Sequence, residues 1–186
     1  MRWCRDKRKT WGAALLLLGM ATRRTIDELL AAPGPSRWPQ SLDGITYAGL
    51  VALQQAAAKG YAALAEAACR VLLDIEPAEV AALPAYDVAG LTNMALRELE
   101  RIGKLFETCK VEPSDIEKRA NPPAGDWFTM VDGYARRMGY VDHNAAAEVR
   151  WEYYLRCATI DAEQNRYERR RAALQLEEMK RKQKKR

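Results

Sequence analysis

The stretch that decides the fold reads DVAGLTNMALRELERIGKLF and runs from Asp87 to Phe106. Apolar side chains recur in it at steps of three and four, at Val88, Leu91, Ala95, Leu99, Ile102 and Phe106. This spacing places them on one stripe of an α-helix, with charged residues on the other faces. Asp87 is a suitable N-cap, and Glu100 precedes Lys104 in the favourable order for a helical ion pair. The stretch therefore predicts an amphipathic helix that packs within a helical domain.

Helical patterns flank this stretch on both sides, and no segment alternates convincingly in the period of a β-strand. Caps, prolines and glycines set the limits of the expected helices. These cover residues 26–32, 46–58, 61–73, a short helix opening at 76–79, residues 126–138, and a last helix from His143 or Asn144 almost to the C-terminus. The sequence thus predicts an all-α fold, a small multi-helix bundle with a C-terminal helical extension and a basic tail.

Proline and glycine also suggest where domains end. Residues 109–125 contain Pro113, Pro122, Pro123 and Gly125 among many charged residues, which is typical of a linker. The expected segments are an extension at 1–21, a helical core domain at 22–108, the linker at 109–125, a C-terminal helical segment at 126–164 and a basic tail at 165–186.

The first 21 residues join a basic start to an apolar run of 11 residues. A transmembrane helix needs about 20 residues, so this run is too short to form one. Three interpretations stay open: a signal peptide with the small residues Gly19 and Ala21 at positions −3 and −1 of its cut, an extension preceding a true start at Met20, or an apolar helix that docks on the core. The first would export the protein, and the others leave it in the cytoplasm.

Positive charge is concentrated at the two ends of the chain. The whole sequence has a net charge of +5, whereas residues 1–10 carry +4 and residues 165–186 carry +7. The 154 residues between them therefore sum to −6. Only the tail is a candidate for binding an acidic surface or phosphates, and its simpler interpretation is a solvated helix end.

Residue types needed for catalysis or metal binding do not cluster in the sequence. Cys4, Cys69, Cys109 and Cys157 lie far apart, and the interior ones are expected to be small buried side chains. His143 is the only histidine, and a capping or surface role is expected for it. Phosphate-loop, dinucleotide and zinc-protease motifs are missing. We therefore predict a protein that is not an enzyme and has no cofactor, catalytic or metal-binding residues.

The candidate partner-binding side chains are aromatic and sulfur residues of the two C-terminal helices, with arginines of the tail. They are Trp127, Met130, Tyr134, Trp151, Tyr154, Arg169, Arg170 and Arg171. Tyr167 is the only aromatic residue within the tail, so stacking on single-stranded bases has little support.

Three short segments carry a family resemblance: ITYAGL at 45–50, VLLDIEPAEVAAL at 71–83 and YDVAGL at 86–91. With them, residues 45–106 resemble the tail assembly chaperones of long-tailed bacteriophages. In that family a helix is followed by a short helix of the pattern x-Pro-x-Glu and then by a long capped helix. Residues 126–140 resemble the aromatic–basic–glycine helix of extended members.

The resemblance implies a cytoplasmic helical protein of the infected host cell. It would coat the tape-measure protein, bring tail-tube subunits to it and leave before the virion is complete. Amphipathic helices of this kind can shield the apolar stripes of a long helical partner. The alternative is a helical nucleic-acid-binding or DNA-packaging protein that uses the basic tail. A third interpretation is an exported or membrane-associated helical protein that uses residues 1–21.

Overall fold

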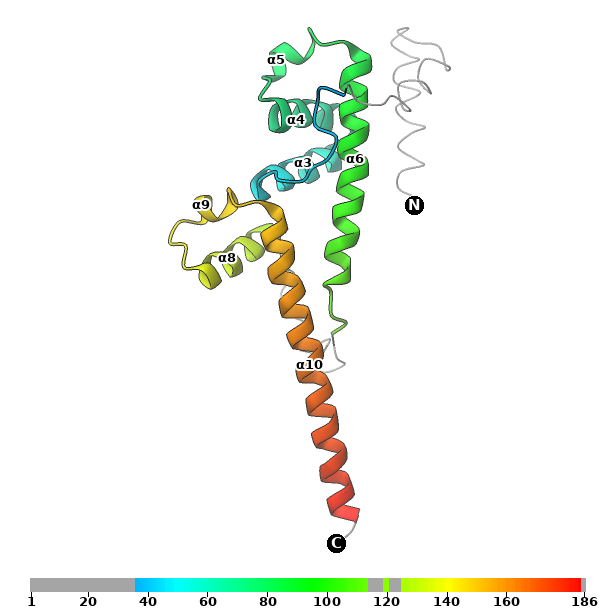
Figure 1. The fold of residues 1–186 in the computed structure, drawn as a ribbon, viewed down its shortest axis with the longest axis vertical. Coiled ribbons are helices and arrows are strands. Elements are labelled where there is room, and N and C mark those ends of the chain that lie inside the picture. Colours follow the sequence, from blue (N-terminus) through cyan, green and yellow to red (C-terminus); the bar gives the residue numbers. More distant parts are fainter. Residues whose placement is uncertain (1–35, 114–118, 121–124, 185–186) are drawn as a thin grey trace, which may run out of the picture. The chain divides into compact units, whose positions relative to one another are not determined.

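The computed structural model describes residues 36–113, 119–120 and 125–184. The predicted helix at 26–32 and the whole of 1–21 lie outside these residues. Within the described ranges the chain is helical, with no strand, and this confirms the predicted all-α class (Figure 1). The helices are α3 (Tyr47–Lys59), α4 (Tyr61–Leu73), α5 (Pro77–Val80), α6 (Ala85–Thr108), α8 (Trp127–Met138), α9 (His143–Ala147) and α10 (Trp151–Lys184).

Two helices match their predicted bounds to within one residue. α4 covers residues 61–73, as expected. The Asp126 carboxylate caps α8 by accepting the amide hydrogen of Thr129 at 2.8 Å, and Gly139 ends it with a φ of 75°. Glycine adopts this left-handed conformation without the steric cost that a β-carbon brings. None of the helices in the described part of the chain has the length and apolarity to cross a membrane.

The predicted N-cap of α6 is wrong, because the helix begins before Asp87. The helix begins at Ala85, so Asp87 lies inside its first turn and is not the N-cap. The Pro84 carbonyl accepts the amide hydrogens of Asp87 at 3.0 Å and Val88 at 3.2 Å, which starts the helix earlier. The Asp87 carboxylate pairs instead with Arg37, 3.6 Å away.

The predicted last helix is two helices, because the backbone between them has other partners. Residues 148–150 separate α9 from α10. The Val149 carbonyl accepts the amide hydrogen of Tyr47 at 2.8 Å, and the Trp151 amide donates to the Ile45 carbonyl at 3.2 Å. This pairing, which forms an isolated antiparallel bridge between Thr46 and Arg150, replaces helical hydrogen bonds at the break.

The described chain divides into two compact units. The first contains residues 36–42 and 52–99, and the second contains residues 43–51 and the described residues from Glu100 onward. This division differs from the predicted boundary at 109–125, because the end of α6 groups with the C-terminal helices. The Phe106 ring lies 6.4 Å from the Trp151 ring, and the Arg101 guanidinium lies over Trp151.

The core of the first unit forms between α4, the end of α3 and the first half of α6. Its larger buried apolar side chains are Leu42, Leu53, Leu64, Cys69, Leu91 and Met94. The Tyr61 hydroxyl donates a hydrogen bond at its edge, with the Ala89 carbonyl and Asn93 Oδ1 each 3.1 Å away. Burial raises the pKa of Tyr61 to about 12, so its phenol stays protonated and remains a donor.

Candidate functional site

Three of the predicted partner-binding residues, Met130, Tyr134 and Tyr154, meet around Tyr47 in the core of the second unit. A fourth, Trp151, packs there against Phe106. The Tyr154 ring is stacked against Tyr47 at 4.0 Å and against Tyr134 at 4.3 Å between ring centroids. The Tyr47 hydroxyl donates to the Met130 sulfur at 3.2 Å. Trp151 and Tyr154 are each only 2% exposed, and Tyr134 is 5% exposed. The prediction that these three side chains offer a binding surface is therefore not supported, because they already pack against their own chain.

Hydrogen bonding completes this aromatic core. The Tyr154 hydroxyl donates to the Ala146 carbonyl at 2.8 Å, which ties α10 to α9. Burial raises the pKa of Tyr47 to about 12, and burial also raises the pKa of Tyr154, so both phenols stay protonated. These tyrosines are thus structural donors that connect the start of α3 to α8, α9 and α10.

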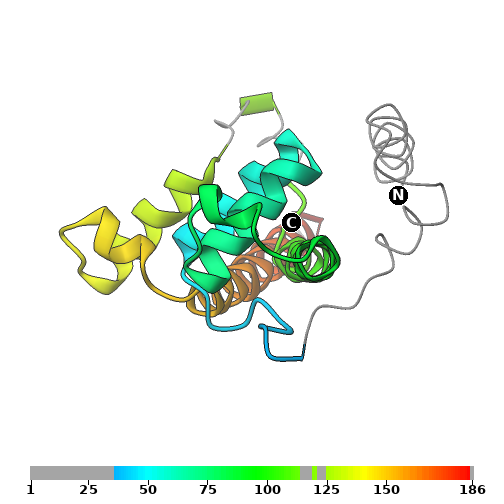
Figure 2. The ribbon, with the colours of Figure 1, turned by 90° about the horizontal axis from the view of Figure 1, so that it is seen from above.

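Trp127 is the predicted aromatic residue that the structure does expose. It belongs to a group that we call the α8–α9 surface, the exposed apolar side chains of α8 and of the loop that follows it. The group comprises Trp127, Phe128, Met138, Tyr140 and Val141. Trp127 is 44% exposed and Val141 is 97% exposed, so apolar area of these helices faces solvent. Figure 2 shows α8 and α9 side by side.

A polar cluster lies beside Phe128 of this surface. His143 opens α9, and its ring is stacked on Phe128 with 5.2 Å between centroids. Its Nε2 atom lies 3.1 Å from Asp132 Oδ1, and the other carboxylate oxygen pairs with Arg136 at 2.9 Å. The His143 hydrogen bond, helped by Arg136, lowers the pKa of Asp132. His143 therefore has the expected surface role, but the cap of α9 is Asp142.

The predicted arginines have different surroundings. Arg169 donates to the Glu112 carbonyl, and Arg166 donates to the Thr108 carbonyl at 2.7 Å, so both turn toward the segment after α6. Arg170 and Arg171 are exposed, and neither makes an ion pair with another residue of the described ranges. Only these two of the three predicted arginines present a free cation.

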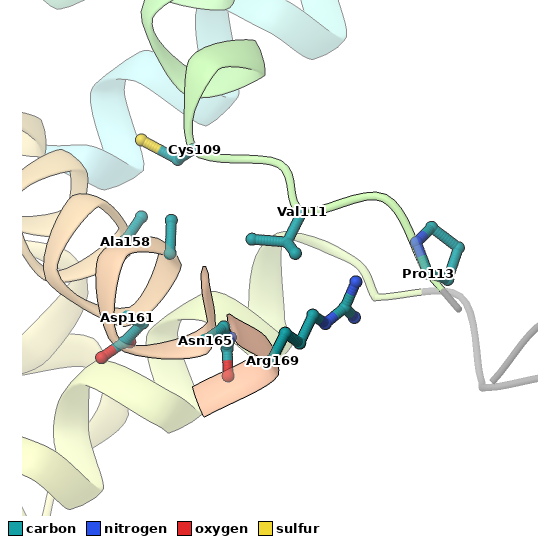
Figure 3. A pocket seen from close by; sticks show the side chains of 8 residues that line it. Cys109, Val111, Pro113, Ala158, Asp161, Asn165 and Arg169 are labelled. Carbon is teal, nitrogen blue, oxygen red and sulfur yellow. The ribbon is translucent and has the colours of Figure 1, made fainter. Parts of the chain in front are cut away.

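A shallow groove of about 440 Å³ lies between α10 and the segment after α6 (Figure 3). Its lining residues are Cys109, Val111, Pro113, Ala158, Asp161, Ala162, Asn165 and Arg169. The Asp161 carboxylate is already paired with Arg137 at 2.7 Å. Cys109 and Cys157 are half-buried, whereas Cys69 alone of the three is fully buried, so the predicted burial of interior cysteines holds only for Cys69. The two charged side chains of the groove, Asp161 and Arg169, therefore already have partners within the chain.

Sequence reasoning missed Phe128, Met138, Tyr140 and Val141 as exposed apolar residues. The helical pattern identified the inward stripe of α8 but gave no reason to examine its ends and the following loop. Among the residues that the structure describes, no three or more His, Cys, Asp or Glu side chains gather where they could hold a metal ion.

Comparison with protein-family models, with curated proteins and with solved structures gives no match. The class that the fold defines is an all-α protein with an exposed apolar surface on α8 and the loop that follows it. A long helix with exposed cations, α10, is its second accessible feature.

Proposed function

We propose that this chain is a phage tail assembly chaperone, a non-catalytic helical protein of the host cytoplasm that binds the tape-measure protein and recruits tail-tube subunits. The α8–α9 surface is the observation that carries the proposal. Trp127 and Val141 expose apolar area that a helical partner with apolar stripes would cover. Tryptophan is also a residue type that often dominates the energy of such interfaces.

The order of helices in the first unit adds support. α4 ends at Leu73, the short α5 begins with Pro77, and the long α6 carries Asp87 in its first turn. This order of a helix, a short helix that opens with proline and a long helix is the one that the family resemblance implies, although Asp87 lies in the first turn of α6 and does not cap it. The helix order concerns residues 45–106, whereas the exposed surface falls mostly in residues 126–140, which also resemble the family. What the structure adds there is the exposure of the apolar side chains.

Co-expression with any very long helical protein that the neighbouring genes encode tests the proposal. We expect the two proteins to co-purify and the partner to stay soluble. The double variant Trp127→Ser, Val141→Ser should weaken binding by about tenfold or more. Leu176→Ser is the matched control, since Leu176 is an exposed apolar residue away from this surface.

Two outcomes would reject the proposal. One is failure of the unaltered chain to bind that partner at all. The other is equal loss of binding in the double variant and in the Leu176→Ser control, because binding would then not depend on the α8–α9 surface. Circular dichroism establishes that each variant keeps its helical content.

The exposed cations of α10 favour one alternative function, nucleic-acid binding through the basic tail. Arg170 and Arg171 are free to contact phosphates. The salt titration described in the Discussion decides between this alternative and the chaperone.

A further inference from the structure

We propose that α10 pairs with α10 of a second copy of this chain, in an antiparallel coiled coil centred on Tyr167. The proposal concerns a different surface from α8–α9 and does not depend on the identity of the partner proposed above.

The first observation is an exposed apolar stripe on α10. Its large side chains recur every seven residues, and they are Tyr153, Ile160, Tyr167 and Leu174. Their exposed fractions are 43%, 46%, 53% and 63%, in that order. The buried residues of α10, Trp151, Tyr154 and Ala162, lie on other faces of the helix than the stripe. The stripe therefore remains available when the second unit is folded.

The spacing indicates the shape of the occupant. Seven residues of an ideal α-helix turn by about 20° less than two full turns, so such a stripe drifts slowly around the helix. A second helix that winds around α10 with a left-handed supercoil follows the stripe along its length. From Tyr153 to Leu174 the stripe is about 32 Å long at the helical rise per residue. A flat or globular surface would contact only part of it.

The charges beside the stripe indicate that this second helix is another α10. Each stripe residue is followed three positions later by a charged side chain, and all four are exposed. In chain order these are Arg156, Glu163, Arg170 and Glu177. We call them the alternating row, since their signs are positive, negative, positive and negative.

Antiparallel pairing makes the alternating row complementary to itself. A twofold axis at Tyr167 places Ile160 of one copy opposite Leu174 of the other. It also sets the alternating row of each copy against the same row running in reverse. Glu163 then lies beside Arg170, and Arg156 beside Glu177, with each pair occurring twice. All four contacts join opposite charges.

Parallel pairing has no such complementarity. In a parallel pair, the alternating row of one helix lies beside the other side of the stripe on the second helix. That side consists of the residues four positions after each stripe residue. Arg170 would lie beside Arg171, and Glu177 beside Glu178, which repel. The charges thus select the antiparallel orientation.

Sedimentation of the full chain over about 1–100 μM tests the proposal, and a monomer–dimer equilibrium is expected in this range. Glu163→Arg replaces both Glu163–Arg170 pairs of the dimer with pairs of arginines, which repel. It should therefore weaken dimerisation about tenfold. Adding Arg170→Glu to it restores opposite charges at those positions, so the double variant should return to within about threefold of the unaltered chain. Glu168→Arg is the matched control, since Glu168 lies off both flanks.

Oxidative cross-linking tests the orientation. Chains with Ile160→Cys mixed with chains with Leu174→Cys should form a mixed disulfide dimer, while Ile160→Cys alone should not cross-link above the unaltered chain with its own cysteines. Self-cross-linking of Ile160→Cys would show parallel pairing and overturn the proposal. A monomer at every concentration, weakening by Glu168→Arg equal to that by Glu163→Arg, or no recovery in the double variant would also overturn it.

Discussion

Tyr154 illustrates how one residue holds several elements of the second unit. Its ring is stacked between Tyr47 and Tyr134, and its hydroxyl donates to the Ala146 carbonyl. Tyr154→Phe keeps both stacked rings and removes one hydrogen bond, so it should lower the free energy of unfolding by about 1–2 kcal/mol. Tyr154→Ala should cost about 3–5 kcal/mol, because it also removes the ring. Urea denaturation measures both values, and an equal cost for the two variants would contradict the stacked core.

Ile102 and Leu99 lie on the same predicted stripe but differ in burial. Ile102 is 0% exposed, whereas Leu99 is only half-buried. We expect Ile102→Ala to cost about 2–5 kcal/mol of unfolding free energy. The sequence pattern alone assigns that cost to Leu99→Ala, which should instead be clearly smaller because less of the side chain leaves the core. Thermal and urea unfolding of the two variants side by side gives the comparison.

The Asp126 cap of α8 makes stability depend on pH. Hydrogen bonds from Thr129 to the ionised carboxylate lower the pKa of Asp126 below its usual value. Because the folded-state pKa lies below the unfolded-state pKa of about 3.9, the ionised carboxylate stabilises the folded protein above that pH. This stabilisation is lost as the pH falls through the folded-state pKa. Asp126→Ala should therefore lower the thermal midpoint at pH 7, and this difference should shrink below about pH 4. A difference that is constant across this range would exclude a role for the ionised cap.

At the scale of elements, the second half of α10 is a helix without a core of its own. After Ala162 every described side chain of α10 is exposed. A chain ending at Asn165 should therefore keep the thermal midpoint of the full chain when both are measured at a concentration too low for dimerisation. It should lose only the ellipticity of about 20 helical residues. A large fall in the midpoint would mean that the contacts of Arg166 and Arg169 with the segment after α6 are structurally essential.

At the scale of the whole chain, the basic tail attracts an anionic partner, whereas the acidic middle repels it. Residues 165–186 carry +7 and the 154 residues from 11 to 164 carry −6. We expect duplex and single-stranded DNA to bind weakly and to dissociate near physiological salt, because few aromatic side chains add a non-ionic term. A salt titration with the full chain and with the chain ending at Asn165 measures this.

Nucleic-acid binding as a function makes a different prediction for the same titration. Affinity would fall with a log–log slope near −0.9 for each duplex phosphate contacted. Sub-micromolar binding at physiological salt that is lost on truncation would favour the nucleic-acid alternative over the chaperone.

Local signals in the sequence determine the helical class and much of the element order. Asp126 and Gly139 limit α8, and the stripe of Val88, Leu91 and Ile102 identifies α6, because caps and periodicity act within a few residues of one another. The ion pair between Glu100 and Lys104, at 3.0 Å, is predictable for the same reason.

Burial was decided only by the tertiary structure. Tyr153 and Tyr154 are neighbours of the same residue type, yet the first is 43% exposed and the second is 2% exposed. The break before α10 likewise depends on residues 45–47, about 100 positions away. The seven-residue spacing of α10 is present in the sequence, but its meaning depends on which face of the helix the fold covers. That choice comes from contacts between distant segments, which no local pattern encodes.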